Sequence, residues 1–208
     1  MPSAIAEDGL TLRDRKRART RRALVAAAVD LFETRGYDET TVADIAATAE
    51  IGTRTFFSYF AAKEELLFPE SDGRVRATVD AIATRRPGER PADVLLRALR
   101  NVGATNDDMV GQLGALRMRL FQTVPAVRGR ALQIQLDAQR KIASHLHDAF
   151  PDDLDEASAA ALVGAFVGAI TGALQVLLED PAATGREPAE LREALRRATD
   201  VALAPWTR

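Results

Sequence analysis

The 208-residue chain contains no cysteine, which excludes disulfide bonds, thiolate metal sites and a cysteine nucleophile. Its only histidines, His145 and His147, are two residues apart and point to different faces of a helix, so they lack the i, i+4 spacing of a histidine metal site. The motifs G-x-S-x-G, G-x-x-x-x-G-K and H-E-x-x-H are also missing. We therefore expect no catalytic residue, no metal and no cofactor. A helical hydrolase is the alternative, because catalytic groups can lie far apart in a sequence.

Aromatic residues are scarce, at 5% of the chain, whereas hydrophobic residues make up 47%. The core must therefore be built mainly from Ala, Leu and Val, a mixture that favours packed helices over sheets. Residues 1–12 contain Glu7 and Asp8 and no apolar stretch, so we expect a disordered tail rather than a secretory signal. The composition and the helical patterns described below predict an all-α protein of about nine helices. A chain without cysteine or a secretory signal is compatible with the cytoplasm, which is the location we expect.

A strong net charge is missing too, since the whole chain carries only −2. The charge is nevertheless uneven, because residues 13–22, the basic arm, hold seven basic residues against one acidic residue. The basic residues of this arm are Arg13, Arg15, Lys16, Arg17, Arg19, Arg21 and Arg22. Such a cluster favours contact with DNA phosphates, with a solvated helix start as the alternative.

Residues 41–63 contain two short helical patterns separated by a break at residues 50–52. The first pattern has apolar residues at i, i+3, i+4 and i+7, which are Val42, Ile45, Ala46 and Ala49. Thr41 precedes it and Asp44 follows three residues later, a weaker form of the capping box that starts many helices. A longer amphipathic helix is expected at residues 13–35. Two short helices joined by so tight a turn predict a helix-turn-helix, whose second helix enters the DNA major groove.

Three groups of residues follow one another at fixed spacing across residues 20–67. They are Leu31, Phe32, Gly36 and Tyr37, then Thr41, Val42, Ile45 and Ala46, then Thr55, Phe56, Phe57, Tyr59, Phe60, Lys63, Glu64 and Leu66. This ordered set resembles the N-terminal domain of the tetracycline-repressor (TetR/AcrR) family of bacterial transcription regulators. The resemblance implies a three-helix DNA-binding domain, followed by a C-terminal helical domain that binds a ligand and forms a homodimer.

The same resemblance places DNA base contacts at the start of the second helix of the motif, at Thr53, Arg54 and Phe57. Physically, Arg54 can donate two hydrogen bonds to guanine and Phe57 can pack on a thymine methyl group. Core packing is the alternative for Phe57. Contacts to the DNA backbone are expected from Thr41, Tyr59 and Lys63 and, in the basic arm, from Arg17 and Arg19.

Several residues depart from the family pattern, among them Glu50, Phe57, Ser58 and the pair Ala61-Ala62. Glu50 stands at a turn position where the family often has glycine, and a positive φ angle there would cost about 1 kcal/mol relative to glycine. Ser58 stands where the family often has a basic residue, so we expect one phosphate contact fewer. These departures concern affinity and operator sequence more than the fold.

Beyond the motif, Pro69 and Gly73 predict a break near residues 68–73, with a helix restarting at Asp72. The remaining helices are expected at residues 91–102, from Asp107 or Asp108 to about 125, and at 125–150, 157–178 and 188–203. The expected regions are a disordered tail at residues 1–12, a DNA-binding domain at 13–67, and a ligand-binding and dimerisation domain at 68–208.

Residues 157–178 carry no charge and are long enough to span a bilayer. Acidic residues flank both ends, and no Lys, Arg, Trp or Tyr lies close by, so we expect a buried helix and no membrane partner. Small and apolar residues on this helix and the last one predict a homodimer interface in a four-helix bundle, with an intrachain core as the alternative. The interface residues are Gly164, Gly168, Gly172, Leu191, Leu195 and Ala198.

The sequence thus predicts a DNA-binding transcriptional regulator, a repressor that binds a palindromic operator in double-stranded DNA as a homodimer. An unknown small-molecule effector would release it. Apolar residues that can line the effector pocket are Met109, Leu113, Leu116, Phe121, Leu132, Leu136 and Phe166. The alternative is a helical relative without DNA binding that acts as a partner-binding or membrane-associated protein.

Overall fold

The structure is a computed structural model that describes residues 11–105, 109–179 and 186–206. Across these residues the chain forms nine α-helices and two 3-10 turns, and no strand, which confirms the all-α prediction. The chain divides into two compact units, Met1–Pro69 and Glu70–Arg208. Most of the tail expected to be disordered, residues 1–10, lies outside the described residues.

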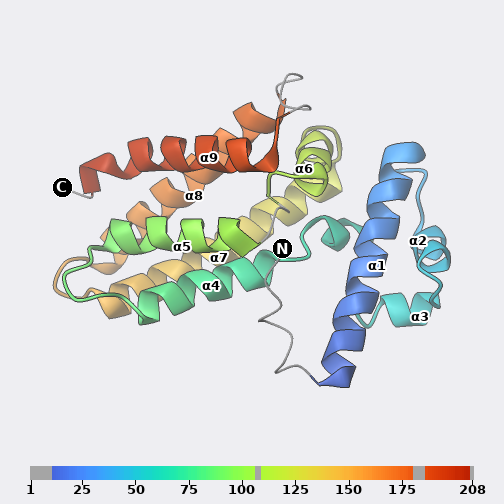
Figure 1. Ribbon diagram of the computed structural model, residues 1–208, viewed down its shortest axis with the longest axis horizontal. Coiled ribbons are helices and arrows are strands. Elements are labelled where there is room, and N and C mark those ends of the chain that lie inside the picture. Colours follow the sequence, from blue (N-terminus) through green and yellow to red (C-terminus); the bar gives the residue numbers. More distant parts are fainter. Residues whose placement is uncertain (1–10, 106–108, 180–185, 207–208) are drawn as a thin grey trace. The chain divides into compact units, whose positions relative to one another are not determined.

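The first unit consists of three α-helices and one 3-10 turn (Figure 1). These elements are α1 (Leu12–Thr34), α2 (Val42–Thr48), α3 (Thr53–Phe56) and η1 (Lys63–Leu67). α1 packs against α2 and η1, and α2 packs against α3. The largest buried side chains come from every element, and they include Leu24, Phe32, Ile45, Phe56, Leu66 and Leu67. Each short helix therefore contributes one apolar face to the interior of this unit.

α1 begins at Leu12, one residue before its predicted start, and Thr11 and Asp14 form a capping box there. The Asp14 backbone N–H donates to Thr11 Oγ1, and the Thr11 N–H donates to the Asp14 carboxylate. The predicted apolar stripe is confirmed, because Leu24, Ala27, Ala28, Leu31 and Phe32 are all buried. None of residues 12–23 is buried, so the basic arm forms the outer part of α1 beyond the core.

A break separates η1 from α4 (Ser71–Ala83). The residues in the break are Phe68, Pro69 and Glu70. This confirms the predicted interruption, because proline has no N–H to continue a helical ladder. Gly73 lies inside α4 instead of in the break, and the helix restarts one residue earlier than expected.

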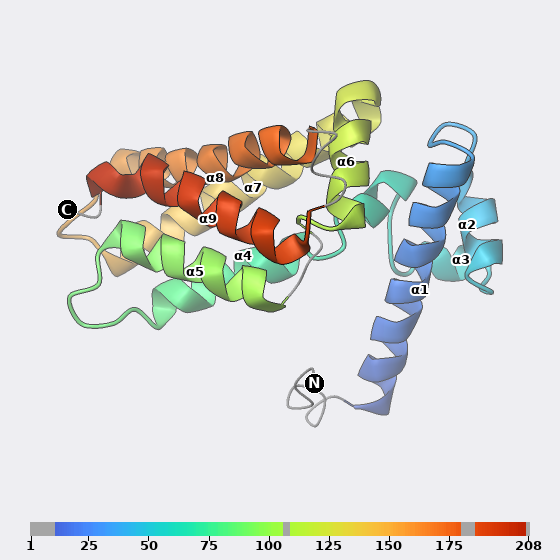
Figure 2. The ribbon, with the colours of Figure 1, turned by 45° about the horizontal axis from the view of Figure 1, so that its top comes forward.

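The second unit is a bundle of six described α-helices with a terminal 3-10 turn (Figures 1 and 2). They are α4, α5 (Pro91–Thr105), α6 (Gln112–Thr123), α7 (Pro125–Ala149), α8 (Glu156–Glu179), α9 (Pro188–Leu203) and η3 (Ala204–Trp206). Proline opens α5, α7 and α9, where its missing N–H costs no helical hydrogen bond. α8 packs against both α7 and α9. Asp107 and Asp108, the predicted start of a helix, lie outside the described residues.

Two buried apolar clusters hold the second unit together. The larger one joins α4, α5, α7, α8 and α9 through residues such as Ile82, Leu95, Leu146, Leu162, Phe166 and Leu203. The smaller one consists of Val110, Leu174, Leu191 and Leu195. Aliphatic side chains dominate both clusters, as the scarcity of aromatic residues predicted.

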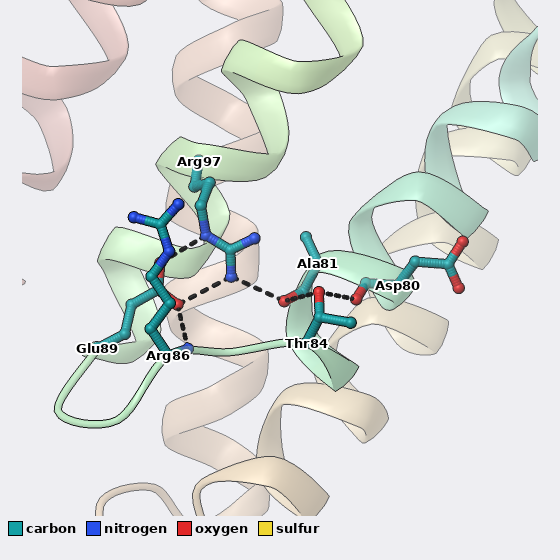
Figure 3. A network of polar contacts seen from close by, with 6 residues as sticks. All are labelled: Asp80, Ala81, Thr84, Arg86, Glu89 and Arg97. Carbon is teal, nitrogen blue, oxygen red and sulfur yellow. Dashed lines mark hydrogen bonds and ion pairs between the residues drawn. The ribbon is translucent and has the colours of Figure 1, made fainter. Parts of the chain in front are cut away.

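An ion pair fixes the loop between α4 and α5 (Figure 3). Arg97 Nε donates to Glu89 Oε1 at 2.6 Å, and Arg97 Nη2 donates to Glu89 Oε2 at 2.8 Å. The same Nη2 donates to the Ala81 carbonyl at 2.9 Å, which gives a partner to a carbonyl at the C-terminal end of α4. The side chains of Arg97 and Glu89 are only 13% and 10% exposed. The hydrogen bonds from Arg97 lower the pKa of Glu89 to about 2.

Candidate nucleic-acid interface

The second helix of the helix-turn-helix is shorter than its pattern predicted. α3 ends at Phe56, whereas Phe56 and Phe60, four residues apart, fit one face of a longer helix. After α3 the Ser58 N–H donates to the Thr55 carbonyl and the Tyr59 N–H to the Phe56 carbonyl. These i to i−3 bonds form a turn after the helix, and the Phe60 N–H also donates to the Phe56 carbonyl. We refer to residues 53–60 as the recognition segment.

The recognition segment has one buried face and one exposed face. Phe56 and Phe60 are 0% and 2% exposed, and their ring centroids are 6.0 Å apart. Thr53 and Arg54 are exposed, and Phe57 is 57% exposed. The structure therefore places the three predicted base-contact residues on accessible surface, and it excludes core packing for Phe57.

Thr41 caps α2 as its sequence position predicted. The Asp44 N–H donates to Thr41 Oγ1 at 3.1 Å, and the Thr41 N–H donates to Asp44 Oδ2 at 2.9 Å. The Thr41 hydroxyl also donates to Asp44 Oδ2, and this bond together with that from the Thr41 N–H holds the pKa of Asp44 below its usual value. The side chain of Thr41 stays exposed beside the start of α2. Its capping role is thus established by geometry, and the exposed position leaves it accessible to a phosphate.

Glu50 occupies the turn between α2 and α3 with a φ of 56°. The Ile51 N–H donates to the Ala46 carbonyl and the Glu50 N–H to the Ala47 carbonyl. This pair of bonds is the Schellman arrangement, in which the C′ residue is left-handed and usually glycine. Glu50 therefore has the positive φ angle that the sequence analysis considered, at a position where the backbone geometry favours glycine.

Tyr59 lies beside the basic arm. The Arg17 guanidinium carbon is 5.2 Å from the centroid of the Tyr59 ring, a distance typical of a cation–π contact. Arg17 and Arg19 are both exposed, and Tyr59 is partly buried. The contact connects α1 to the recognition segment while leaving both arginines open to solvent.

Lys63 has a structural role that the sequence interpretation missed. Its ammonium donates to the carbonyls of Tyr37 at 2.8 Å and Thr40 at 3.0 Å, and it lies 4.1 Å from the Tyr37 ring centroid. Burial and the nearby carboxylate of Glu64 raise the pKa of Tyr37, whose hydroxyl donates to that carboxylate. Lys63 thus ties the loop before α2 to η1. An ammonium has three donors, so one donor is left for a phosphate.

Two residues predicted for the dimer interface are instead core residues. Leu191 and Leu195 of α9 are 3% and 4% exposed and pack with Val110 and Leu174 of the same chain. Their assignment to an interface is wrong, because neighbouring helices of their own chain already cover both side chains. Hydrophobic periodicity finds such a stripe but does not say which helix covers it.

The other predicted interface residues remain accessible. Gly168, Gly172 and Ala198 are exposed and Gly164 is partly exposed. A Cβ atom added to any of these three glycines would meet no atom within 4 Å. The same side of α8 exposes Ala157, Ala161, Ala165 and Val176. We call this uncharged surface the small-residue face of α8.

The residues predicted to line an effector pocket do not share one environment. Phe166 belongs to the larger buried cluster, and Met109 packs against the smaller one. Leu113 and Leu116 are buried and Phe121 is partly buried. Leu132 and Leu136 of α7 are 46% and 52% exposed, so they lie on the surface and do not wall an interior cavity of one chain. A cleft of about 720 Å³ lies elsewhere, between residues 85–90 and 149–153.

Helix α8 also meets the length and hydropathy criteria for a membrane span over Glu156–Leu178. Within its most apolar window, 22% of the residues are buried inside the chain. Core helices of soluble proteins pass the same test, so this property alone does not indicate a membrane. The helix has acidic residues at both ends and lacks the cationic and aromatic anchors that are typical of membrane-spanning helices.

Comparisons with known proteins find relatives of this chain both by sequence and by fold. Residues 24–68 match the model of bacterial regulatory proteins of the tetR family. The HTH-type transcriptional regulator TcmR of Streptomyces glaucescens is 34% identical over 154 residues, which cover 72% of this chain and 68% of TcmR.

Among solved structures, the fold is similar to Thermus thermophilus FadR, a TetR-family transcriptional repressor in complex with lauroyl-CoA. That similarity has a TM-score of 0.55 at 23% identity and covers 88% of this chain and 93% of FadR. The SmeT–triclosan complex has a TM-score of 0.61 at 16% identity and covers 91% of this chain and 92% of SmeT. At these identities the structural matches establish the fold.

Proposed function

The chain belongs to the TetR family of bacterial regulatory proteins and is a DNA-binding transcriptional regulator. On that premise we propose that it is a homodimeric repressor of a near-palindromic operator, released by a small apolar effector. The observation that carries this proposal is the exposed triad of Thr53, Arg54 and Phe57, set on a segment that Phe56 and Phe60 anchor in the core.

Base recognition would come from this exposed triad. The Arg54 guanidinium can donate two parallel hydrogen bonds to O6 and N7 of guanine. The exposed ring of Phe57 offers an apolar surface to a thymine methyl group, and Thr53 Oγ1 can donate to or accept from either base. Burial of the neighbouring Phe56 limits how far the triad can move, which favours a defined register on the DNA.

Backbone contacts would set the orientation of the unit on DNA. Thr41 stands at the N-terminal end of α2, where backbone N–H groups and the helix dipole attract a phosphate. Lys63 has one donor left after its two carbonyl contacts, and Tyr59 lies next to Arg17. Arg17 and Arg19 add charge without reading sequence, so they raise affinity for any duplex.

A homodimer would form through the small-residue face of α8 together with the exposed side of α9. Ala198 and Val201 are exposed on α9, and Val201 is 76% exposed. Glycine and alanine at these positions let a partner helix approach closely, because no side chain stands in the way. Two recognition segments brought together in this way would enter successive major grooves, about 34–36 Å apart.

Effector binding would occur in the second unit. The two structural relatives are complexes with lauroyl-CoA and with triclosan, and both ligands carry large apolar parts. We infer an apolar effector here as well, in contact with Met109, Leu113, Leu116, Phe121 or Phe166. Such an effector would release DNA only by favouring a conformation whose recognition segments no longer match the operator. This function requires neither a catalytic step nor a membrane, and it belongs in the cytoplasm.

Fluorescence anisotropy tests the proposal with labelled DNA from upstream of the protein's own gene and a scrambled duplex of equal composition. We expect tight, salt-dependent binding to the upstream DNA and weak binding to the scrambled duplex. Equal affinity for both duplexes would reduce the function to non-specific attraction, and no binding at low salt would contradict it. Light scattering coupled to size-exclusion chromatography tests the homodimer, and a monomer at micromolar concentration would contradict that part.

A further inference from the structure

Arg21 is the exception within the basic arm. The other six basic residues of the arm are exposed, whereas Arg21 is partly buried. It lies at the inner end of the arm, one helical turn before Leu24, which is the first fully buried residue of α1. Its guanidinium therefore faces the protein at a point where the arm meets the core.

The guanidinium of Arg21 binds two segments that are far away in sequence. Nη1 donates to the Tyr59 carbonyl at 3.3 Å, and Nη2 donates to the Pro69 carbonyl at 2.9 Å. The guanidinium carbon also lies 4.4 Å from the centroid of the Phe60 ring. Tyr59 and Phe60 end the recognition segment, and Pro69 lies in the break that precedes α4.

These contacts suit arginine and no other side chain. Its planar fork can donate in two directions at once while one face lies on an aromatic ring. Both acceptors are backbone carbonyls outside regular helices, so neither has an intrahelical hydrogen bond to lose. One side chain thus joins α1, the end of the recognition segment and the residue from which the chain leaves the first unit.

We propose that Arg21 is a positioning residue for operator recognition, which sets the angle of the recognition segment on α1 without touching DNA. The inference rests on the DNA-binding function proposed above. Its neighbours in the arm act through charge, so they should contribute to all DNA alike. Arg21 uses two of its five N–H donors on carbonyls inside the protein and lies against the Phe60 ring, so it should contribute to the preference for the operator over other DNA.

The test measures affinity for the upstream duplex and for a scrambled duplex at several KCl concentrations. For Arg21→Ala in the full-length protein we expect the operator preference to fall about tenfold or more, as when one base contact is misplaced. The slope of log affinity against log salt on the scrambled duplex should stay unchanged. In the matched control Arg19→Ala, that slope should fall by about 0.9 for a lost phosphate contact, with the preference unchanged.

Two further variants separate positioning from loss of folding. Thr40→Val removes the hydrogen bond from a buried hydroxyl to the Gly36 carbonyl, so it destabilises the first unit without altering the contacts of Arg21. At a temperature where circular dichroism shows every variant folded, Thr40→Val should keep the operator preference that Arg21→Ala loses. Arg21→Lys keeps a cation beside Phe60 but loses the fork, so it should recover part of the preference.

The outcomes distinguish this inference from the proposed function. If the wild-type protein shows no operator preference, the proposed function is wrong and the inference is withdrawn with it. If the wild type discriminates and Arg21→Ala behaves like Arg19→Ala, then Arg21 is a phosphate contact and the inference is overturned. Retention of the full operator preference by Arg21→Ala in a folded protein would overturn it as well.

Discussion

The two units of this protein hold their shapes by different means. In the first unit, helices as short as four and seven residues are fixed by polar ties between distant segments, such as Lys63 to Tyr37 and Arg21 to Pro69. In the second, helices of up to 25 residues pack through aliphatic clusters, with the Arg97–Glu89 ion pair in one loop. Short helices have little buried area, so directional bonds must set their angles, whereas long helices reach a stable arrangement by packing.

The prediction with the largest expected effect tests whether the exposed face of α8 in the second unit forms the dimer interface. Gly168→Glu puts a charge on the small-residue face of α8, where an added Cβ atom would meet nothing within 4 Å. The monomer should stay folded, but the mass in light scattering should shift from dimer to monomer. Operator affinity should then fall by about 100-fold or more, because two linked half-sites no longer act together. In the control Ser144→Glu, at an exposed position of α7, a dimer should remain; a dimeric Gly168→Glu would contradict the interface.

The next prediction concerns the ion pair that sets the second unit apart from a purely aliphatic bundle. The folded-state pKa of Glu89 is lowered from 4.5 to about 2, so its stabilising effect is complete above pH 4.5 and is lost as the pH falls towards 2. A shift of this size corresponds to about 3 kcal/mol of unfolding free energy at neutral pH. Urea titrations from pH 7 to pH 2.5 should show this loss in the wild type. A matching pH dependence in Glu89→Gln would contradict the assignment.

A third prediction concerns base recognition by Arg54, which lies on the recognition segment of the first unit. Arg54→Ala should cost about 1–3 kcal/mol of binding free energy on the operator and much less on a scrambled duplex, because a bidentate guanine contact is lost. Competition titrations with single-base operator variants should show relaxed discrimination at one base pair of each half-site. Uniform weakening on every sequence would make Arg54 a phosphate contact instead.

The smallest expected effect concerns the stability of the first unit at Glu50, in the turn of the helix-turn-helix. Glu50→Gly should raise the unfolding free energy by up to about 1 kcal/mol, since glycine adopts a φ of 56° without strain. It also removes a negative charge next to the recognition segment, so affinity should rise modestly for all DNA. Thermal unfolding followed by circular dichroism gives the stability change. A lower melting temperature for Glu50→Gly would show that the carboxylate makes a compensating contact.

Sequence reasoning succeeded where the determinant is local. The capping box of Thr41 and Asp44 spans three residues, and the break at Pro69 follows from one missing N–H, so both could be predicted. The contacts of Lys63 and Arg21 join residues 23 to 48 positions apart. No periodic pattern reports such distances, so these ties were missed.

The recognition segment and α9 show two other limits. The spacing of Phe56 and Phe60 could not reveal that the α-helix ends at Phe56, because the Phe60 N–H still donates to the Phe56 carbonyl after the helix and keeps both rings on one side. The stripe at Leu191 and Leu195 was recognised as apolar, yet a partner from the same chain and one from a second copy give the same periodicity. Burial in the folded chain was needed to assign it to the core.

The interruption at Phe68–Glu70 has a mechanical consequence. η1 and α4 do not form one continuous rigid helix. Rotation of α4 about its own axis can therefore be accommodated by changes in the backbone dihedral angles of these three residues. Tension is different, because a continuous backbone transmits tension even where it does not resist torsion. We therefore expect an effector that moves the start of α4 to pull on Pro69, whose carbonyl accepts a hydrogen bond from Arg21, and so to change the tilt of the recognition segment.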